Sequence, residues 1–70
     1  MTVKKPRYFV DAQRSVGFDD LETAKEFAKQ NFPCVILERD ESSGRLEWRE
    51  ILRFDWHWDE AHGEPRIGFF

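Results

Sequence analysis

A stretch of thirteen residues, 46–58, constrains the fold of this chain more than any other feature. It reads LEWREILRFDWHW, and in an extended strand its even-numbered side chains are apolar apart from Glu50. Alternation with period two is typical of a half-buried strand, whereas a helix would scatter the three tryptophans around its axis. The sequence therefore predicts a long strand whose apolar face consists of Leu46, Trp48, Leu52, Phe54, Trp56 and Trp58. The other face is predicted to consist of Glu47, Arg49, Ile51, Arg53, Asp55, His57 and Asp59.

The second strong pattern is helical and follows a connecting loop predicted over residues 14–18. Asp19 with Glu22 three residues later matches a capping box, in which the Asp carboxylate accepts a first-turn N–H and the Glu reaches back. Apolar residues then recur at spacings of three and four, which predicts an amphipathic helix of about three and a half turns. Asn31 and Pro33 are expected to end it, because the residue before a proline is pushed out of the helical region.

The remaining segments predict strands around this helix. Residues 7–13 alternate, and residues 34–39 contain four successive apolar residues, which indicates a central strand buried on both faces. A polar turn over 40–45 makes a hairpin with the long strand. Residues 66–70 form an optional last strand, which either folds back on the overhanging end of the long strand or adds to a neighbouring chain. Two relations between residues 7–13 and residues 34–39 stay open. They are parallel strands joined by a right-handed crossover, or they are antiparallel neighbours through the long strand, which changes the sheet order.

Together these elements predict an α+β fold of order β-α-β-β with an optional final β. We expect a two-layer domain: a mainly antiparallel sheet of three or four strands with one helix packed on one face. Residues 1–6 are expected to be a disordered lead and residues 7–70 a single domain. The single cysteine, Cys34, favours a reducing compartment. With no apolar run of signal-peptide or membrane-span length, the expected location is cytoplasmic, without membrane association.

The sequence offers little catalytic or metal chemistry. His57, Asp59 and His62 give a spacing of H-x-D-x2-H at the end of the long strand, which is a weak metal candidate because it matches no established ligand pattern. Cys34 lies at the start of a buried strand, where a thiol behaves as a small hydrophobe. The four glycines are isolated, so no phosphate-binding loop is indicated. We therefore expect no enzyme activity, no metal and no cofactor.

Single-stranded nucleic-acid binding is the alternative function. Arg49 and Arg53 would project from one strand face beside aromatic residues, as in several single-strand binders. Acidic residues on that same face, and a net charge of -3, argue against a nucleic-acid partner.

The favoured function is binding to another protein, which includes a second copy of this chain. The long strand outruns its six-residue hairpin partner, and tryptophan is enriched at binding hot spots. We expect Phe54, Trp56 and Trp58 to be apolar anchors, with Asp55, Asp59 and Glu60 as an acidic rim. Pairing two copies about a two-fold axis would hide the exposed strand end, which predicts a homodimer. The competing interpretation is that the helix stripe and the tail residues Phe69 and Phe70 cover the stripe as core.

Overall fold

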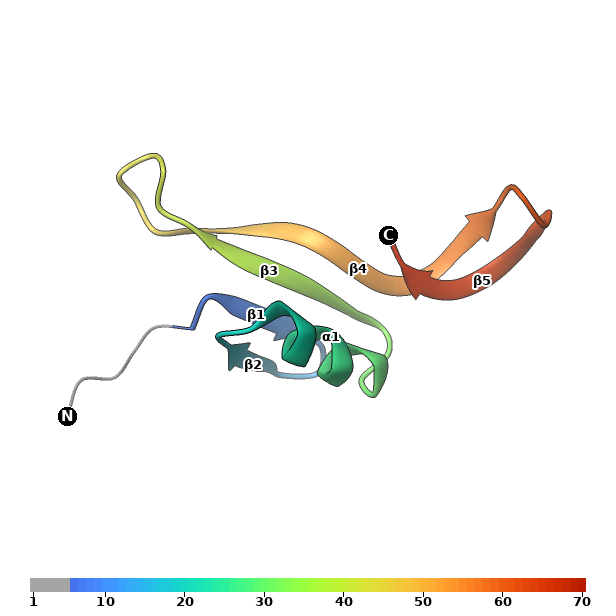
Figure 1. The fold of residues 1–70 in the computed structure, drawn as a ribbon, viewed down its shortest axis with the longest axis horizontal. Helices are drawn as coiled ribbons and strands as arrows, with labels where there is room; N and C mark the ends of the chain where they lie inside the picture. Colours follow the sequence, from blue (N-terminus) through green and yellow to red (C-terminus); the bar gives the residue numbers. More distant parts are fainter. Residues whose placement is uncertain (1–5) are drawn as a thin grey trace.

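The computed structural model describes residues 6–70 and shows one helix with a five-stranded antiparallel sheet (Figure 1). The elements are β1 (Tyr8–Asp11), β2 (Ser15–Phe18), α1 (Leu21–Lys29), β3 (Cys34–Asp40), β4 (Glu47–Asp59) and β5 (Glu64–Phe69). This confirms the predicted α+β class. The predicted number of three or four strands is wrong, because both β2 and β5 join the sheet. The lead expected over residues 1–6 lies outside the described residues apart from Pro6, whose ring lies close to Gly17.

The additional strand β2 comes from residues predicted to be a loop. Ser15–Phe18 turns back on β1 and pairs with it in antiparallel register from Tyr8↔Phe18 to Asp11↔Ser15. This hairpin also decides the strand order, which is β2-β1-β3-β4-β5. Because β2 has already reversed the chain direction before the helix, β3 returns antiparallel to β1 as its direct neighbour. The parallel option left open by the sequence is therefore wrong, and the antiparallel option is right about direction only, because β1 and β3 are direct neighbours and are not related through the long strand.

The helix is shorter than predicted and is capped one residue later. Asp20 is the N-cap, and its carboxylate accepts hydrogen bonds from the backbone N of Thr23 at 3.0 Å and from its hydroxyl at 3.1 Å. The predicted capping box of Asp19 and Glu22 is therefore wrong. At the other end, the side-chain amide of Asn31 donates to the carbonyl of Phe27 at 2.8 Å. The helix ends at Lys29, so Phe32 falls outside it.

The core lies between α1 and the β1–β3 part of the sheet. Val10 and Ile36 are fully buried, and the helix meets them with Ala24 and Ala28, which are also fully buried. Small residues at the contact allow the helix to lie close to the sheet. Residues 34–39 do form the central strand as predicted, but only the side that faces α1 is fully buried, since Val35 and Leu37 are half-buried. We call the side that carries α1 the covered side and the opposite side the open side.

A β-bulge in β4 changes which side chains share a face. Ile36 pairs with Leu52 and Leu37 pairs with Glu50, so Ile51 is an extra residue without a partner in β3. An extra residue shifts the two-residue alternation, and side chains before and after it change sides. Ile51 and Leu52 both pack toward the core on the covered side. The predicted single apolar face is therefore wrong: Trp48 lies on the open side, whereas Phe54, Trp56 and Trp58 lie on the covered side.

The far end of β4 extends beyond the body of the molecule. β3 begins at Cys34, which pairs with Phe54, so the rest of β4 pairs only with β5. We call this two-stranded hairpin, residues 54–69, the arm; it projects from the body in Figure 1. The radius of gyration is 13.9 Å, against about 11 Å for a compact chain of this length. Among the described residues, no helix has the length and apolar character needed to cross a membrane.

Candidate functional site

The arm has one apolar face and one polar face. Phe54, Trp56 and Trp58 of β4 lie directly opposite Phe69, Ile67 and Pro65 of β5. Directly opposite residues in an antiparallel pair point to the same side, so these six apolar residues form one continuous face. The other face carries Asp55, His57 and Asp59 opposite Gly68, Arg66 and Glu64. The arm therefore has the pattern of a half-buried sheet, with its apolar face on the covered side.

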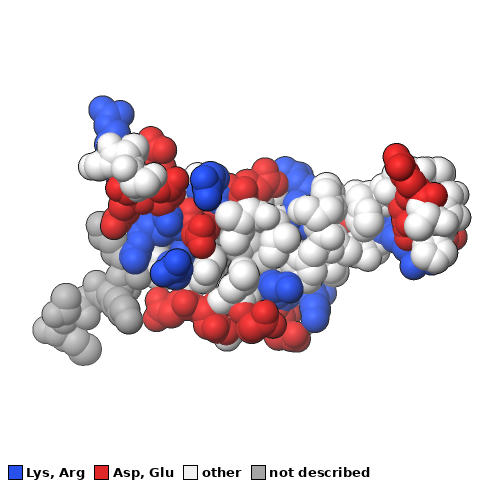
Figure 2. Space-filling view, turned by 45° about the horizontal axis from the view of Figure 1, so that its top comes forward, with Lys and Arg blue, Asp and Glu red and all other residues white. Residues whose placement is uncertain are grey.

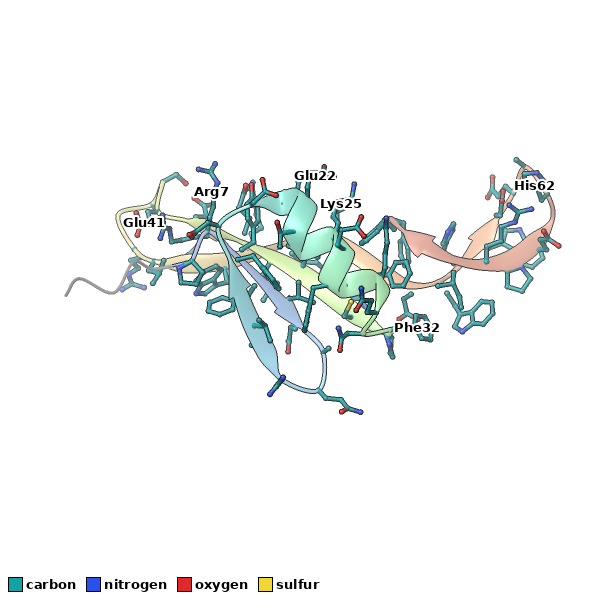
Figure 3. All side chains as sticks on the ribbon, turned by 60° about the horizontal axis from the view of Figure 1, so that its bottom comes forward. Arg7, Glu22, Lys25, Phe32, Glu41 and His62 are labelled. Atoms are coloured by element: carbon teal, nitrogen blue, oxygen red, sulfur yellow. The ribbon has the colours of Figure 1, made fainter. Side chains whose placement is uncertain are left out.

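The base of the arm is partly covered by the helix and the segment after it. The ring of Phe54 lies 4.8 Å from that of Phe69, and the Phe32 ring lies 6.1 Å from Phe54 and 6.4 Å from Trp56. The ammonium group of Lys25 lies 5.4 Å from the centre of the Phe69 ring. Figure 3 shows Lys25 and Phe32 at the body end of the arm and His62 at its tip. Phe54 and Phe69 are consequently half-buried.

Beyond this base the apolar face is uncovered. Trp56 and Trp58 are 56% and 62% exposed, and Ile67 is 46% exposed. The tail does fold back within the chain, as one of the two predicted options, and Phe69 packs on Phe54. Phe70, however, lies on the other face beside His57, with ring centres 5.1 Å apart. We call the exposed apolar side chains the arm patch; its members are Phe32, Trp56, Trp58, Pro65 and Ile67.

The strand edge beside the arm patch is partly blocked. Arg53 and Phe70 exchange two backbone hydrogen bonds of 2.9 and 3.0 Å, so odd-numbered residues of β4 bond toward β5. The backbone groups of Trp56 and Trp58 therefore point to the opposite edge, beyond the start of β3. There, the Asp55 carboxylate accepts a hydrogen bond from the backbone N–H of Trp56 at 2.7 Å. Because the N–H of Trp56 already donates a hydrogen bond, this edge is less able to pair with another strand.

The tip of the arm is a four-residue turn organised by Asp59. Its carboxylate accepts from the backbone N of Ala61 at 3.0 Å and lies 2.9 Å from Nδ1 of His62. Gly63 closes the turn at a φ of 62°, in the left-handed region that favours glycine. Hydrogen bonding to His62 is the main cause that lowers the pKa of Asp59, and the Arg66 guanidinium also contributes. Figure 2 shows acidic side chains gathered at this tip.

The tip does not bring the weak metal candidates together. Asp59 and His62 are in contact, but His57 packs on Phe70 along the strand. Within residues 6–70, no three His, Cys, Asp or Glu side chains are grouped as a metal ion would require. The Asp59 carboxylate is instead engaged with the backbone of its own turn. Of the predicted acidic rim, Glu60 lies exposed at the tip, while Asp55 and Asp59 are committed to local hydrogen bonds.

The two arginines of the nucleic-acid alternative lie on different sides of the sheet. Arg49 pairs with Glu38 on the covered side, and Arg53 pairs with Val35 on the open side. The bulge at Ile51 is the reason, so their predicted common face is wrong. Each also lies near a carboxylate: Arg53 at 2.8 Å from Glu50 and Arg49 at 3.9 Å from Asp40. The geometry that motivated the alternative is therefore absent.

Two hollows on the surface lie beside the helix, and one of them, of about 430 Å³, reaches Phe32 of the arm patch. A cavity of about 480 Å³ lies between the β1–β2 turn and the end of α1, lined by Ala12, Gln13, Arg14, Phe27 and Asn31. This lining contains no acid, nucleophile or histidine to pair with the arginine. Cys34 is buried, as predicted, and its Sγ lies 3.4 Å from the carbonyl of Ala28. Burial, with a smaller effect from Asp55, raises the pKa of this thiol.

Three members of the arm patch were missed by sequence reasoning. Phe32 lies where the helix is expected to end, Ile67 lies in the optional last strand, and Pro65 lies between that strand and the predicted long strand. The alternation in residues 64–69, EPRIGF, does place Pro65, Ile67 and Phe69 on one face. Only the pairing register shows that this face is shared with the tryptophans of β4.

Comparison with known proteins finds no matching family, no matching curated protein and no matching solved structure.

Proposed function

We propose that this chain is a small non-enzymatic interaction protein that binds another protein through the arm patch. The single observation that carries the proposal is the arm itself: a two-stranded hairpin with a continuous apolar face that no other part of residues 6–70 covers at Trp58 and Ile67. Its proposed compartment is the cytoplasm, supported by the use of one cysteine.

The physical support is that the arm is an unfavourable shape for an isolated molecule. Two-stranded hairpins are marginally stable in water unless a further layer covers their apolar face. At about 250 Å² for a fully exposed indole, the exposed fractions of Trp56 and Trp58 leave on the order of 300 Å² of ring surface in water. A patch of a few hundred Å² is about as large as the largest apolar patch on a typical monomer, and such a patch is often functional. A partner that covers it would supply the missing layer.

Site-specific photo-crosslinking in cells tests this proposal. A photoreactive phenylalanine analogue replaces Trp58, in the arm patch, in one variant of this chain. In a second variant it replaces His57, on the polar face. We expect a discrete crosslinked protein adduct from position 58 that is absent from position 57. Equal labelling from both positions, or no adduct from position 58, would contradict the assignment of the arm patch as the binding surface.

A further inference from the structure

We infer that the partner of the arm patch is a second copy of this chain, with the two apolar faces stacked and the two arms running in opposite directions about a two-fold axis. This inference rests on the proposed function, because it names the partner of the same surface. A two-fold contact uses the same patch on both copies, so the patch must be complementary to itself. Both the apolar pattern and the charges of the arm meet this requirement.

The apolar pattern is symmetric along the arm. The exposed pair Trp56 and Ile67 lies at its middle, with Phe54 and Phe69 on the body side and Trp58 and Pro65 on the tip side. A two-fold axis at the middle pair therefore sets the Trp58 level of one copy against the base of the other arm, where the exposed Phe32 ring lies beside Phe54. Two sheets packed face to face in this way bury both inner faces at a separation of about 10 Å. Each copy supplies the layer that the other lacks.

The charges at the two ends of the arm have opposite signs where the stacking would bring them together. At the body end, the ammonium group of Lys25 lies over Phe69 on the apolar face. At the tip, Asp59 and Glu64 lie on the polar face and are paired with Arg66 at 3.3 and 2.8 Å, which leaves the exposed carboxylate of Glu60 for a contact with the other copy. In the antiparallel arrangement the tip of each copy reaches the body end of the other. Glu60 of each copy therefore approaches Lys25 of the other, which gives two equivalent contacts. A parallel stack would instead place the two acidic tips together. An acidic tip also argues against an anionic membrane as the occupant.

Stacking is favoured over pairing at the free edge of β4. Pairing at the free edge of β4 would require the N–H of Trp56, which already donates to Asp55. The pairing of β3 with β4 begins at Cys34↔Phe54, directly after Pro33, which has no N–H to donate. Edge pairing would in addition leave the indoles in water. The face, in contrast, offers its exposed side chains without any rearrangement of the backbone.

Solution mass measured by light scattering over a wide concentration range tests the inference. We expect the parent chain to pass from 8.4 kDa to twice that mass as concentration rises. Trp58→Ala should raise the dissociation constant by about 30-fold or more, the loss typical of a hot-spot residue. His57→Ala, on the polar face of the same strand, should leave it unchanged. Circular dichroism checks that both variants keep the parent fold.

Charge reversal then tests the direction of the arms. Lys25→Glu and Glu60→Lys should each weaken the dimer about fivefold, because two exposed ion pairs become repulsive, and the double variant should restore the parent value. Glu41→Lys makes the same charge change in the distant β3–β4 turn and serves as the control. If the double variant is no better than either single variant, the antiparallel arrangement is wrong.

Fluorescence separates stacking from edge pairing. Trp48 lies on the open side, so it is replaced by Phe to leave the emission of Trp56 and Trp58. Stacking predicts a blue shift of this emission as the dimer forms, whereas edge pairing predicts none. A chain that stays monomeric at all concentrations overturns the inference. If position 58 nevertheless crosslinks a different protein, the proposed function stands and only the identity of the partner changes.

Discussion

The ring of Phe9 in β1 lies 4.6 Å from the ring of Trp48 in β4, with the two planes inclined at 64°. This edge-to-face contact crosses β3 on the open side, where no helix packs. The three tryptophans consequently have two different roles. Trp48 holds the open side of the sheet together, whereas Trp56 and Trp58 are exposed on the covered side of the arm.

Replacing these tryptophans should separate the two roles. We expect Trp48→Ala to lower the free energy of unfolding by about 1–2 kcal/mol, because a half-buried indole and its aromatic partner are lost. Trp58→Ala should change it by less than about 0.5 kcal/mol, as an exposed substitution does. Urea unfolding measures the free energy of unfolding of both variants, at a protein concentration well below the dissociation constant of the dimer. Equal losses would show that the arm tryptophan is also part of the folded core of the monomer.

Deletion of Ile51 should be tolerated better than deletion of a paired residue of β4. Without Ile51, Glu50 is followed directly by Leu52, so Leu37↔Glu50 and Ile36↔Leu52 become successive regular pairs and the other side chains of β4 keep their sides. We expect a loss of about 1 kcal/mol in the free energy of unfolding, because one half-buried side chain is removed. Deletion of the exposed Arg49 should cost about 2 kcal/mol or more, because it turns Trp48 to the covered side or shifts the pairing with β3. Thermal unfolding compares the two variants, and a larger loss for Ile51 would contradict its role as the extra residue of the bulge.

Two adjacent aspartates test the position of the helix cap. Asp20→Ala removes the acceptor for the Thr23 N–H and should lower the free energy of unfolding by about 1 kcal/mol. Asp19→Ala removes only a charge near the start of the helix, which is worth a few tenths of a kcal/mol. Chemical denaturation distinguishes them. A larger loss for Asp19 would support the capping box predicted from the sequence.

Acid should weaken the arm turn through Asp59. Its pKa is lowered from 3.8 in the folded chain, so the folded state binds fewer protons than the unfolded state in this range. The stabilisation is therefore present above the unfolded value and is lost as pH falls through the lower, folded value. We expect the free energy of unfolding of Asp59→Asn to depend less on pH below 3.8 than that of the parent chain. Urea unfolding between acid and neutral pH measures this, and parallel curves would contradict it.

Residue spacing within one segment correctly predicts the type of secondary structure of that segment. The period of two in residues 46–58 correctly predicts the long strand, and the period of three to four predicts the helix. Cys34 and the central strand are also placed correctly. The candidate anchors Trp56 and Trp58 share the face of Phe54 as expected, since all three follow the bulge.

The α+β class follows from the sequence, because amphipathic periods arise from residue spacing within one segment. Which segments meet depends on contacts between elements that lie far apart along the chain. The pairing of β1 with β2 depends on contacts between strands, and the bulge at Ile51 appears only when β4 is matched against β3. That one extra residue put Trp48 and Arg53 on the open side and Arg49 on the covered side. The arm patch, likewise, exists because the register of β5 places Ile67 and Pro65 beside the tryptophans.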